Sequence, residues 1–535
     1  MSSLSVSIPT PVLYIIHHLK KHGYEGYLVG GSVRDLLGNS LGVYEEKKTV
    51  TVADFDFTTN ALPEQILEIF KDSFYENAFG TVSVTPENLN EQMIEDGWAI
   101  EENNQSTTNN IKKTIDLENV SKLHDSLDLP ARESIDTVPH NFEITTFRSN
   151  EVYEHDARHP SNFNWGEKLE DDLSRRDFTI NGLTINVKNE KLAEVFSSTT
   201  TNLPAEVNLT MNDYDLIDQF NGLDDLRNNI IRTIGDPDSR FNEDALRLLR
   251  AIRFSVQLNF EIEENTYYAI IRNKDLIKKI SWERITIEFL RILTSDYPKE
   301  GILLLDETGL LEYILPELID GKGMEQCGHH LTDVWQHSLD AVANCPNKDP
   351  IVRLATLLHD VGKPATRQGN PGAYTFYNHE VEGAHLSKKI ARRLKLSSES
   401  LNRLFILVRY HMFYYQPENT DASIRRFMRK VGLENLNDIL DLREADRLGS
   451  NAWRTSWRLE EMKQRMIEQL HQPMEVRDLA VNGHDLMTEL NLQPGPILGE
   501  IGTYLLELVL DDSNLNDKET LLKLAKTYLD NHAPV

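Results

Sequence analysis

The chain has 535 residues, of which 40% are apolar and 26% charged, and a formal net charge of −29. This length exceeds one ordinary domain and predicts several modules, each with its own hydrophobic core. The acidic total argues at first sight against a nucleic-acid partner, because backbone phosphates demand positive charge. The net charge does not show how the charges are distributed along the chain, however.

The two cysteines, Cys327 and Cys345, are too few for a disulfide framework or a zinc site of four thiolates, and they fit a reducing compartment. The sequence contains no apolar run of about 18 residues and no secretory signal pattern at its N-terminus. We therefore expect a cytoplasmic protein that does not interact with a membrane.

The N-terminal part alternates between helical and strand patterns, which predicts an α/β module. Helices are expected at 9–22 (PTPVLYIIHHLKKH), in "GSVRDLLG" and in "LPEQILEIF", where Pro63 lies near the first turn. Strands are expected in "GYLVGG", "KKTVTVADFDFTT", "GTVSV" and "NFEITTFR".

Two polar segments interrupt this pattern. Residues 87–138 contain "EENNQSTTNN" and few aromatic residues, and we expect a partly disordered insertion there. Residues 197–212 (SSTTTNLPAEVNLTMN) are expected to form a loop. From about residue 222 the helical periodicity continues to the end of the chain.

A glycine turn follows the first predicted strand. Gly30 and Gly31 lie between this strand and a helix, and Arg34 and Asp35 follow them. Glycines at this point let backbone N–H groups approach a phosphate, which the helix N-terminus also attracts. Taken alone, the turn is more typical of a purely structural connection.

Asp54 and Asp56 are spaced i and i+2 in a predicted strand, so both carboxylates should lie on one face. A divalent cation such as Mg²⁺ would relieve their repulsion. The alternative is a solvated strand face. Combined with the glycine turn and Arg34, the pair favours metal-assisted transfer of a nucleotide.

A cationic segment follows in "LEDDLSRRDFTINGLTIN", where Arg175, Arg176 and Asp177 are adjacent. An arginine fork matches the oxygen atoms of a triphosphate. Without the other motifs, the same residues would indicate an ordinary charged surface.

Together these segments resemble the class II tRNA nucleotidyltransferases and bacterial poly(A) polymerases of the DNA polymerase β-like superfamily. The matching motifs, in the order typical of that family, are "GGSVRD", "DFDFTT", "FRSNEVYEHDARHP", "EDDLSRRDFTINGL", "GDPDSRFNEDALRLLRAIRF" and "ISWERITIEFLRIL". The resemblance implies an enzyme that adds nucleotides to an RNA 3′ end without a template.

The resemblance also implies roles for individual residues. Asp54 and Asp56 would be the catalytic carboxylates that bind Mg²⁺, and Gly31, Arg34 and Arg176 would contact the nucleotide. Residues 147–160 match the flexible loop that the family uses when it switches from C to A. The two polar segments depart from the family pattern but spare these motifs.

The segment "NEDALRLLRAIRF" (242–254) carries Asp244, Arg247, Arg250 and Arg253 on what we expect to be one continuous helix. Its spacing alone predicts a salt-bridged surface. The resemblance implies instead that Asp244 and Arg247 read the base edge shared by cytosine and adenine. Arg250 and Arg253 would then contact phosphate or brace the site.

A second group of motifs resembles the HD phosphohydrolase superfamily. The expected metal ligands are His337, His359, Asp360 and Asp446, with His379 and His411 as additional candidates, as in binuclear members. The bound ion would be Mg²⁺, Mn²⁺ or Ni²⁺. In related nucleotidyltransferases such a domain is linked to phosphohydrolase action on damaged RNA ends. Basic runs at 388–395 and 425–430 offer candidate phosphate contacts.

We therefore expect an α+β fold, with a polymerase β-like head followed by helical domains. The expected boundaries are a head at 9–221, a helical neck that selects the nucleobase at 222–320, an HD domain at 321–470 and a helical tail at 471–535.

The expected activity is addition of C, C and A to the 3′ end of tRNA from CTP and ATP. The alternatives are addition of CC or A alone, poly(A) synthesis, or an HD phosphohydrolase whose head only binds nucleotide. The sequence does not determine the oligomeric state.

Overall fold

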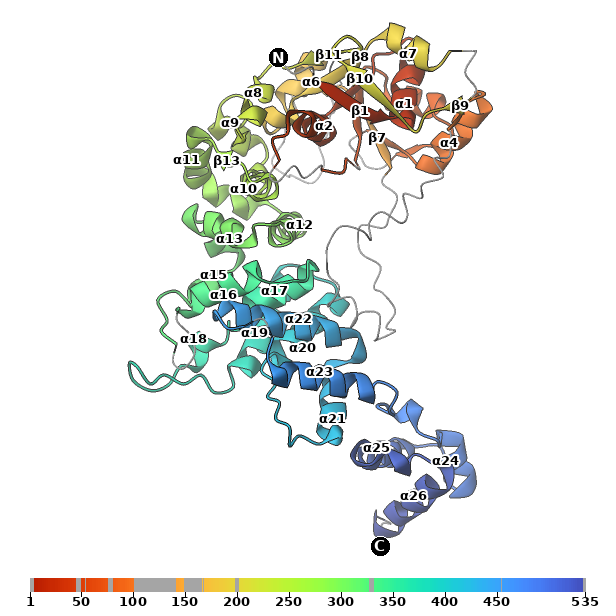
Figure 1. Cartoon of the computed structure of the whole chain (residues 1–535), viewed down its shortest axis with the longest axis vertical. Helices are drawn as coiled ribbons and strands as arrows, with labels where there is room; N and C mark the ends of the chain where they lie inside the picture. Colours follow the sequence, from red (N-terminus) through yellow and green to blue (C-terminus); the bar gives the residue numbers. More distant parts are fainter. Residues whose placement is uncertain are drawn as a thin grey trace. The chain divides into compact units, whose positions relative to one another are not determined.

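The computed structural model describes residues 4–44, 50–52, 54–75, 80–100, 141–148, 166, 168–197, 202–326, 332–453 and 455–532. These residues form two compact units (Figure 1). The first unit draws on Met1–Ile115, Arg132–Ile292 and Leu303–Tyr313, and the second mainly on Leu293–Ile302 and Ile314–Val535. Each unit is described by itself.

A mixed seven-stranded sheet organises the first unit, with strand order β11-β8-β2-β3-β7-β5-β4. Strands β3 and β7 are parallel, and the other neighbouring pairs are antiparallel. The strands are β2 (Tyr27–Val29), β3 (Asp56–Thr59), β4 (Phe74–Tyr75), β5 (Thr81–Val84), β7 (Phe142–Thr146), β8 (Thr184–Val187) and β11 (Tyr214–Ile217). This sheet and the helices of the chain confirm the predicted α+β class.

The predicted N-terminal helices are present as α1 (Thr10–Lys21), α2 (Gly31–Leu41) and α3 (Pro63–Ile69). Helix α2 starts immediately after Gly30, which has φ of 80° and so uses a backbone conformation that favours glycine. Val33 and Leu37 of α2 are fully buried, which fixes this helix in the first unit.

The second predicted strand is shorter than expected. Strand β3 begins at Asp56, because the pairing with both neighbouring strands starts at this residue. Asp56 pairs with Val29 of β2 and with Glu143 of β7. Asp54 therefore precedes the strand, and the side chain of Asn39 rather than a neighbouring strand pairs with the backbone of Val50. The prediction that both aspartates lie on a strand was therefore wrong for Asp54.

The two polar segments are partly regular structure. The first begins with α4 (Pro86–Glu95), which Thr85 caps and which buries Leu89 and Met93, and with β6 (Ala99–Ile100). The expected loop at 197–212 contains β9 (Asn202–Leu203) and β10 (Glu206–Thr210). Strand β10 pairs with the N-terminal strand β1 (Ser5–Pro9), which gives it a partner that local composition did not reveal. Residues 101–140 and 198–201 lie outside the described residues.

The helices that complete the first unit include a break where we expected continuity. They are α8 (Gly222–Arg227), α9 (Pro237–Glu243), α10 (Arg247–Leu258), α11 (Glu264–Asn273), α12 (Trp282–Leu293) and α13 (Pro298–Glu307). Asp244 has extended backbone angles between α9 and α10, and its Oδ1 accepts a hydrogen bond from the Leu246 N–H. Such local side-chain bonds compete with helix formation, so the predicted continuous helix was wrong.

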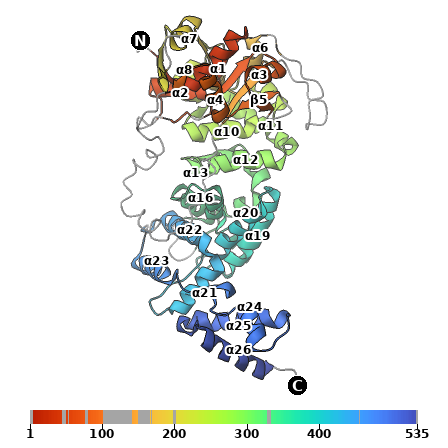
Figure 2. The ribbon, with the colours of Figure 1, turned by 90° about the vertical axis from the view of Figure 1, so that its right-hand side faces the viewer.

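The second unit is helical. Its main helices are α16 (Val334–Ala343), α17 (Pro350–Leu358), α19 (His379–Arg393), α20 (Ser398–Tyr410), α21 (Asp421–Val431), α22 (Leu436–Gly449), α23 (Trp457–Gln469), α24 (Gly483–Glu489), α25 (Pro496–Asp511) and α26 (Lys518–His532). Helices α19 and α20 pack together, as do α16 and α22 (Figure 2). Leu505, Leu506 and Val509 of α25 form the core of the C-terminal helices.

The basic run at 425–430 is partly committed to this packing. Arg425 is buried and donates to the Leu510 carbonyl, while Arg426 and Arg429 pair with Glu507. Arg425 is therefore a structural residue rather than an open phosphate contact. Within the described chain, no helix is long and apolar enough to cross a membrane.

Candidate active site and metal cluster

A cavity of about 940 Å³ opens in the first unit and collects the predicted nucleotide-binding and catalytic residues. All nine line it, although they come from four separate segments of the sequence: Gly31, Arg34, Asp54, Asp56, Arg176, Asp244, Arg247, Arg250 and Arg253. The structure therefore places the carboxylate pair, the glycine turn and the arginine row in one site.

Gly30 makes close approach of the charged groups possible. A Cβ atom at this position would lie 3.1 Å from Oδ2 of Asp56 and 3.2 Å from Nη1 of Arg176. Both distances are tighter than ordinary contacts. The absent side chain thus leaves room for a carboxylate and a guanidinium at the start of α2.

Asp56 lies in an environment that disfavours its own negative charge. Burial raises the pKa of Asp56, the charge of Arg176 counteracts this effect, and the neighbouring Asp54 raises the pKa further. A cation at the two carboxylates would offset both the burial and the mutual repulsion. The oxygen donors of Asp54 and Asp56 fit a hard divalent ion.

Asp172 fixes the two consecutive arginines. Its carboxylate is buried and accepts from Nε of Arg175 at 3.3 Å and from Nη2 of Arg176 at 3.2 Å. Burial works against the charged carboxylate, but these arginines outweigh it and lower the pKa of Asp172. No sequence pattern distinguishes Asp172 from the acidic residues around it.

Arg34 is held by residues that our sequence reasoning did not assign to the site. Its guanidinium donates two hydrogen bonds to Asp35, at 2.8 and 2.9 Å, and one to Oδ1 of Asn181 at 2.9 Å. It also lies 5.4 Å from the ring centre of Phe254. In the sequence, the only indication that Asp35 and Asn181 belong to the site is that they lie in the same motifs as the predicted site residues.

Two arginines of the row brace the cavity. Nε of Arg250 donates to Asp177 at 2.7 Å. Burial raises the pKa of Asp177, but the charge and hydrogen bond of Arg250 help to lower it to about 2. Arg253 and Glu288 form a buried pair at 3.1 Å. Burial lowers the pKa of Arg253 to about 10 against the opposing effect of Glu288.

The other two residues of the row have separate partners. Arg247 donates to Oε2 of Glu243 at 2.8 Å and to the carbonyl of Arg175 at 2.6 Å. Asp244 accepts instead from Arg284, a cavity residue that the sequence reasoning missed because it follows about forty positions later on α12. Asp244 and Arg247 face one cavity without forming a pair with each other.

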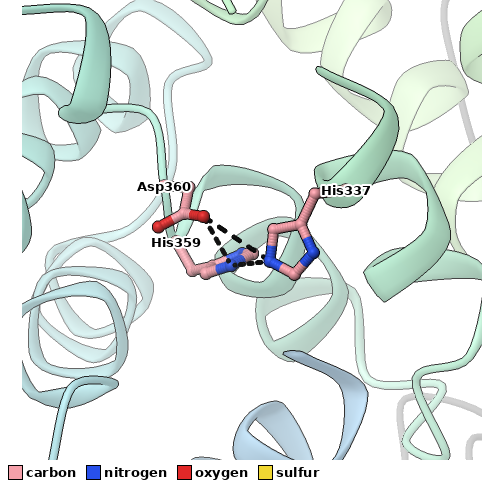
Figure 3. A group of neighbouring side chains, drawn as sticks. All are labelled: His337, His359 and Asp360. Atoms are coloured by element: carbon pink, nitrogen blue, oxygen red, sulfur yellow. Dashed lines mark hydrogen bonds and ion pairs between the residues drawn. The ribbon is translucent and has the colours of Figure 1, made fainter. Parts of the chain in front are cut away.

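A cluster of buried imidazoles and carboxylates lies in the second unit (Figure 3). The Nε2 atoms of His337 and His359 are 3.0 Å apart, and they lie 3.5 and 3.3 Å from Oδ2 of Asp360. Oδ1 of Asp446 is 3.2 Å from Nε2 of His337. The structure therefore brings together all four residues predicted as metal ligands.

His379 and His411 complete a second group around the same aspartate. Their Nε2 atoms lie 3.3 and 3.9 Å from Oδ1 of Asp360. Both atoms are buried without a hydrogen-bond partner among the described residues. Asp360 thus offers one oxygen to each group.

Backbone carbonyls set the orientation of three of these rings. Nδ1 lies 2.7 Å from the Thr356 carbonyl in His359, 2.8 Å from the Phe376 carbonyl in His379 and 2.7 Å from the Val408 carbonyl in His411. A neutral ring that donates through Nδ1 keeps a lone pair on Nε2, which is the arrangement that metal-binding histidines use.

Two glycines bring the elements of this cluster together. A Cβ atom on Gly362 would lie 2.1 Å from the carbonyl oxygen of His379 and 2.5 Å from the nitrogen of Gly383. No side chain fits at such distances. The turn that carries His359 and Asp360 therefore packs directly on the backbone of α19.

Family models of known proteins match residues in both units of the chain. The family model "Poly A polymerase head domain" matches residues 26–122 and 98–232, and "Probable RNA and SrmB- binding site of polymerase A" matches 259–321. The model "tRNA nucleotidyltransferase domain 2 putative" matches residues 375–525.

Individual relatives extend this likeness over the whole chain. A CCA-adding enzyme of Streptococcus agalactiae is 27% identical over 520 residues, which cover 97% of this chain and 96% of the relative. An A-adding tRNA nucleotidyltransferase of Deinococcus radiodurans is 33% identical over 350 residues, 62% of this chain and 73% of the relative.

Among solved structures, the Bacillus stearothermophilus CCA-adding enzyme in complex with CTP superimposes with a TM-score of 0.61. It is 25% identical, and the match covers 98% of this chain and 100% of that structure. The chain belongs to the family of tRNA nucleotidyltransferases and bacterial poly(A) polymerases. It is therefore an enzyme, and its class is that of the nucleotidyltransferases.

Proposed function

We propose that this protein is a CCA-adding enzyme that extends the 3′ end of tRNA with C, C and A. In the reaction, the 3′-hydroxyl oxygen of the tRNA attacks the α-phosphate of CTP and later of ATP. The bond from the α-phosphate to pyrophosphate breaks, and the hydroxyl proton is lost. The observation that carries the proposal is that all nine predicted residues line one cavity in a chain that matches a CCA-adding enzyme over 97% of its length.

The charges of the cavity support a division of labour. Asp54 and Asp56 would hold Mg²⁺, which supplies positive charge at the reacting oxygens. Arg34 and Arg176 are fixed by Asp35 and Asp172 and would bind the triphosphate, together with the backbone at Gly31. Arg250 and Arg253 would brace the site through Asp177 and Glu288.

Asp244 and Arg247 would select the base. Cytosine and adenine both carry an amino donor beside a ring-nitrogen acceptor, which a carboxylate and a guanidinium complement. Uracil and guanine reverse this pattern and would leave polar groups unpaired, at a cost of about 1–3 kcal/mol for each group. Of the loop at 147–160 that the family uses in the switch from C to A, residues 149–160 lie outside the described residues.

Incubation with tRNA that lacks CCA tests the proposal. CTP alone should add two nucleotides, ATP alone should add none, and both together should complete CCA and stop. Extension by A only on tRNA that already ends in CC would show an A-adding enzyme, and a long adenylate product would show a poly(A) polymerase. A tRNA substrate also implies action in the cytoplasm.

The metal cluster favours a second candidate function, a metal-dependent phosphohydrolase. Five buried candidate ligands form two groups of three that share Asp360, and Asp446 lies beside His337. The cluster therefore has the donors for two divalent ions, for which Mg²⁺, Mn²⁺ and Ni²⁺ are the candidates. Hydrolysis of 2′,3′-cyclic AMP by the full chain with each metal tests this function. His359→Ala should abolish the hydrolysis, whereas Asp56→Asn should not, and inactivity with every metal would contradict it.

A further inference from the structure

The four most exposed aromatic side chains of the described residues lie close to the metal cluster in the sequence. They are Tyr377, Tyr414, Trp453 and Trp457, with 73, 73, 88 and 61% of their surface exposed. We call these four residues the aromatic rim. Large flat side chains in such exposure are unusual because water contact is unfavourable for them.

The rim residues lie close in the chain to the candidate metal ligands. Tyr377 precedes His379 by two residues and Tyr414 follows His411 by three, while the rings of His379 and His411 are 5.3 Å apart. Tyr377 and Tyr414 therefore flank the same pair of metal-ligand candidates.

Arginines connect the other side of the rim to Asp446. Arg443 donates to Oδ2 of Asp446 at 2.7 Å and lies 5.7 Å from the ring of Phe413, beside Tyr414. One turn later, Nε of Arg447 donates to the carbonyl of Trp453 at 3.1 Å. Trp457 follows at the start of α23, where the guanidinium of Arg458 lies 5.3 Å from its ring.

The mixture of rings and cations indicates the chemistry of the ligand. Exposed aromatic rings interspersed with arginines are the surface on which single-stranded nucleic acids stack their bases and place their phosphates. An apolar protein partner would need a continuous apolar patch, whereas here Arg443 lies against Phe413, next to Tyr414 in the chain, and Arg447 binds the backbone of Trp453.

We propose that the aromatic rim binds nucleobases on either side of a phosphate held at the metal cluster, so that the second unit takes a short single-stranded nucleic acid. This inference rests on the proposed role of the cluster as a phosphate site. The stacked rings would select a ligand that carries bases over a simple phosphate ester. Arg443 would serve both Asp446 and the bound phosphate.

Titration of the full chain with pentauridylate, followed through intrinsic tryptophan fluorescence, tests the inference. The proposed head pocket selects against uracil, and Trp453 and Trp457 report directly on the rim. We expect quenching on binding and an affinity at least about tenfold lower in Tyr377→Ala/Tyr414→Ala, since each stacked base contributes about 1–3 kcal/mol. The matched control is Tyr268→Ala, which removes an exposed tyrosine of the first unit.

Two further ligands identify the source of the bases. Binding of UMP with the same dependence on the rim would show that a free nucleotide suffices, whereas preference for pentauridylate would show a strand. Affinities that the double variant leaves unchanged, or that inorganic phosphate matches, would overturn the inference. Binding that persists unchanged in His359→Ala would also overturn the inference, because the phosphate would then not be held at the cluster. Binding that depends on the rim and on His359, without any hydrolysis by the wild type, would instead remove only the phosphohydrolase proposal.

Discussion

Nη2 of Arg284 lies 2.9 Å from Oδ2 of Asp244 and donates a hydrogen bond to it across the cavity of the first unit. The other oxygen of Asp244 accepts from the Leu246 N–H at the start of α10. Both oxygens of the proposed base-reading carboxylate are therefore oriented, one by the neighbouring backbone and one by α12. The direction in which Asp244 faces a base depends on a residue of a different helix.

This relationship predicts how nucleotide choice will change. Asp244→Ala or Arg247→Ala should relax selection while some transfer remains, because the mismatch of uracil or guanine then leaves fewer groups unpaired. Arg284→Ala should raise misincorporation about tenfold, within the 1–3 kcal/mol expected for one misdirected polar group, and Arg284→Lys should restore part of the selectivity. Primer extension with each nucleotide measures this, and unchanged preference for CTP and ATP in all three alanine variants would contradict it.

Loss of one cavity carboxylate should remove transfer almost completely. Asp56→Asn keeps the size of the side chain but removes the charge that a divalent ion needs, so we expect a fall in nucleotide incorporation of about 10³-fold or more. Asp54→Asn should act in the same direction. Glu91→Gln, an exposed change on α4, is the control and should leave the rate unchanged. Retention of rapid incorporation in Asp56→Asn would exclude the proposed metal site.

The buried pair of Arg253 and Glu288 should matter for stability. Glu288→Gln leaves a buried guanidinium without a countercharge, and we expect the free energy of unfolding to fall by about 3–5 kcal/mol. Glu95→Gln breaks the exposed pair with Lys71 and should change the stability little. Chemical denaturation of both variants provides the measurement. Equal stability of the two would show that the buried pair is not a brace.

Stability of the first unit should fall as the pH decreases from about 6.5 to about 4. Burial lowers the pKa of His18 to about 4, despite the opposing charge of Asp96, so in this interval the unfolded chain binds a proton that the folded chain excludes. The stability contributed by neutral His18 is complete above pH 6.5 and is lost as the pH falls. His18→Gln should flatten the dependence in urea titrations, by on the order of 3 kcal/mol, whereas exposed His484→Gln should not.

Removal of divalent metal should destabilise the second unit. The Nε2 atoms of His379 and His411 are buried and have no hydrogen-bond partner in the part of the chain that the structure describes, and a bound ion would satisfy them. We therefore expect EDTA to lower the unfolding temperature of the full chain and Mn²⁺ or Ni²⁺ to restore it. The response should persist in Asp54→Asn/Asp56→Asn and disappear in His359→Ala. Identical melting with and without EDTA would contradict metal binding at the cluster.

Local motifs predicted many of the residues that the structure brings together in the cavity and in the metal cluster. The glycine turn, the acidic pair and the arginine row each have a recognisable spacing, and the structure gathers them in one cavity. Arg284 and Asp172 were missed because their importance comes from contacts with distant or crowded partners rather than from spacing.

The fold departed from the predictions where pairing decides the structure. Strand β10 depends on β1, about two hundred residues earlier, so its polar composition suggested a loop. The break at Asp244 depends on a side chain that competes with the helix for a backbone N–H. Hydrophobic periodicity indicates which face of an element is apolar. It does not indicate the pairing of β10 with β1 or the hydrogen bond from the Leu246 N–H to Asp244.

The contact at Gly362 fixes more than the packing of two segments. Because backbone meets backbone there, the turn that holds Asp360 and the start of α19 are already as close as atoms allow. The backbone of the turn that holds Asp360 therefore cannot move closer to the start of α19 around a smaller ion. The cluster should therefore discriminate between metals by ionic radius as well as by donor chemistry. Gly362→Ala should increase the separation between the turn that holds Asp360 and α19, and shift the preference toward larger ions.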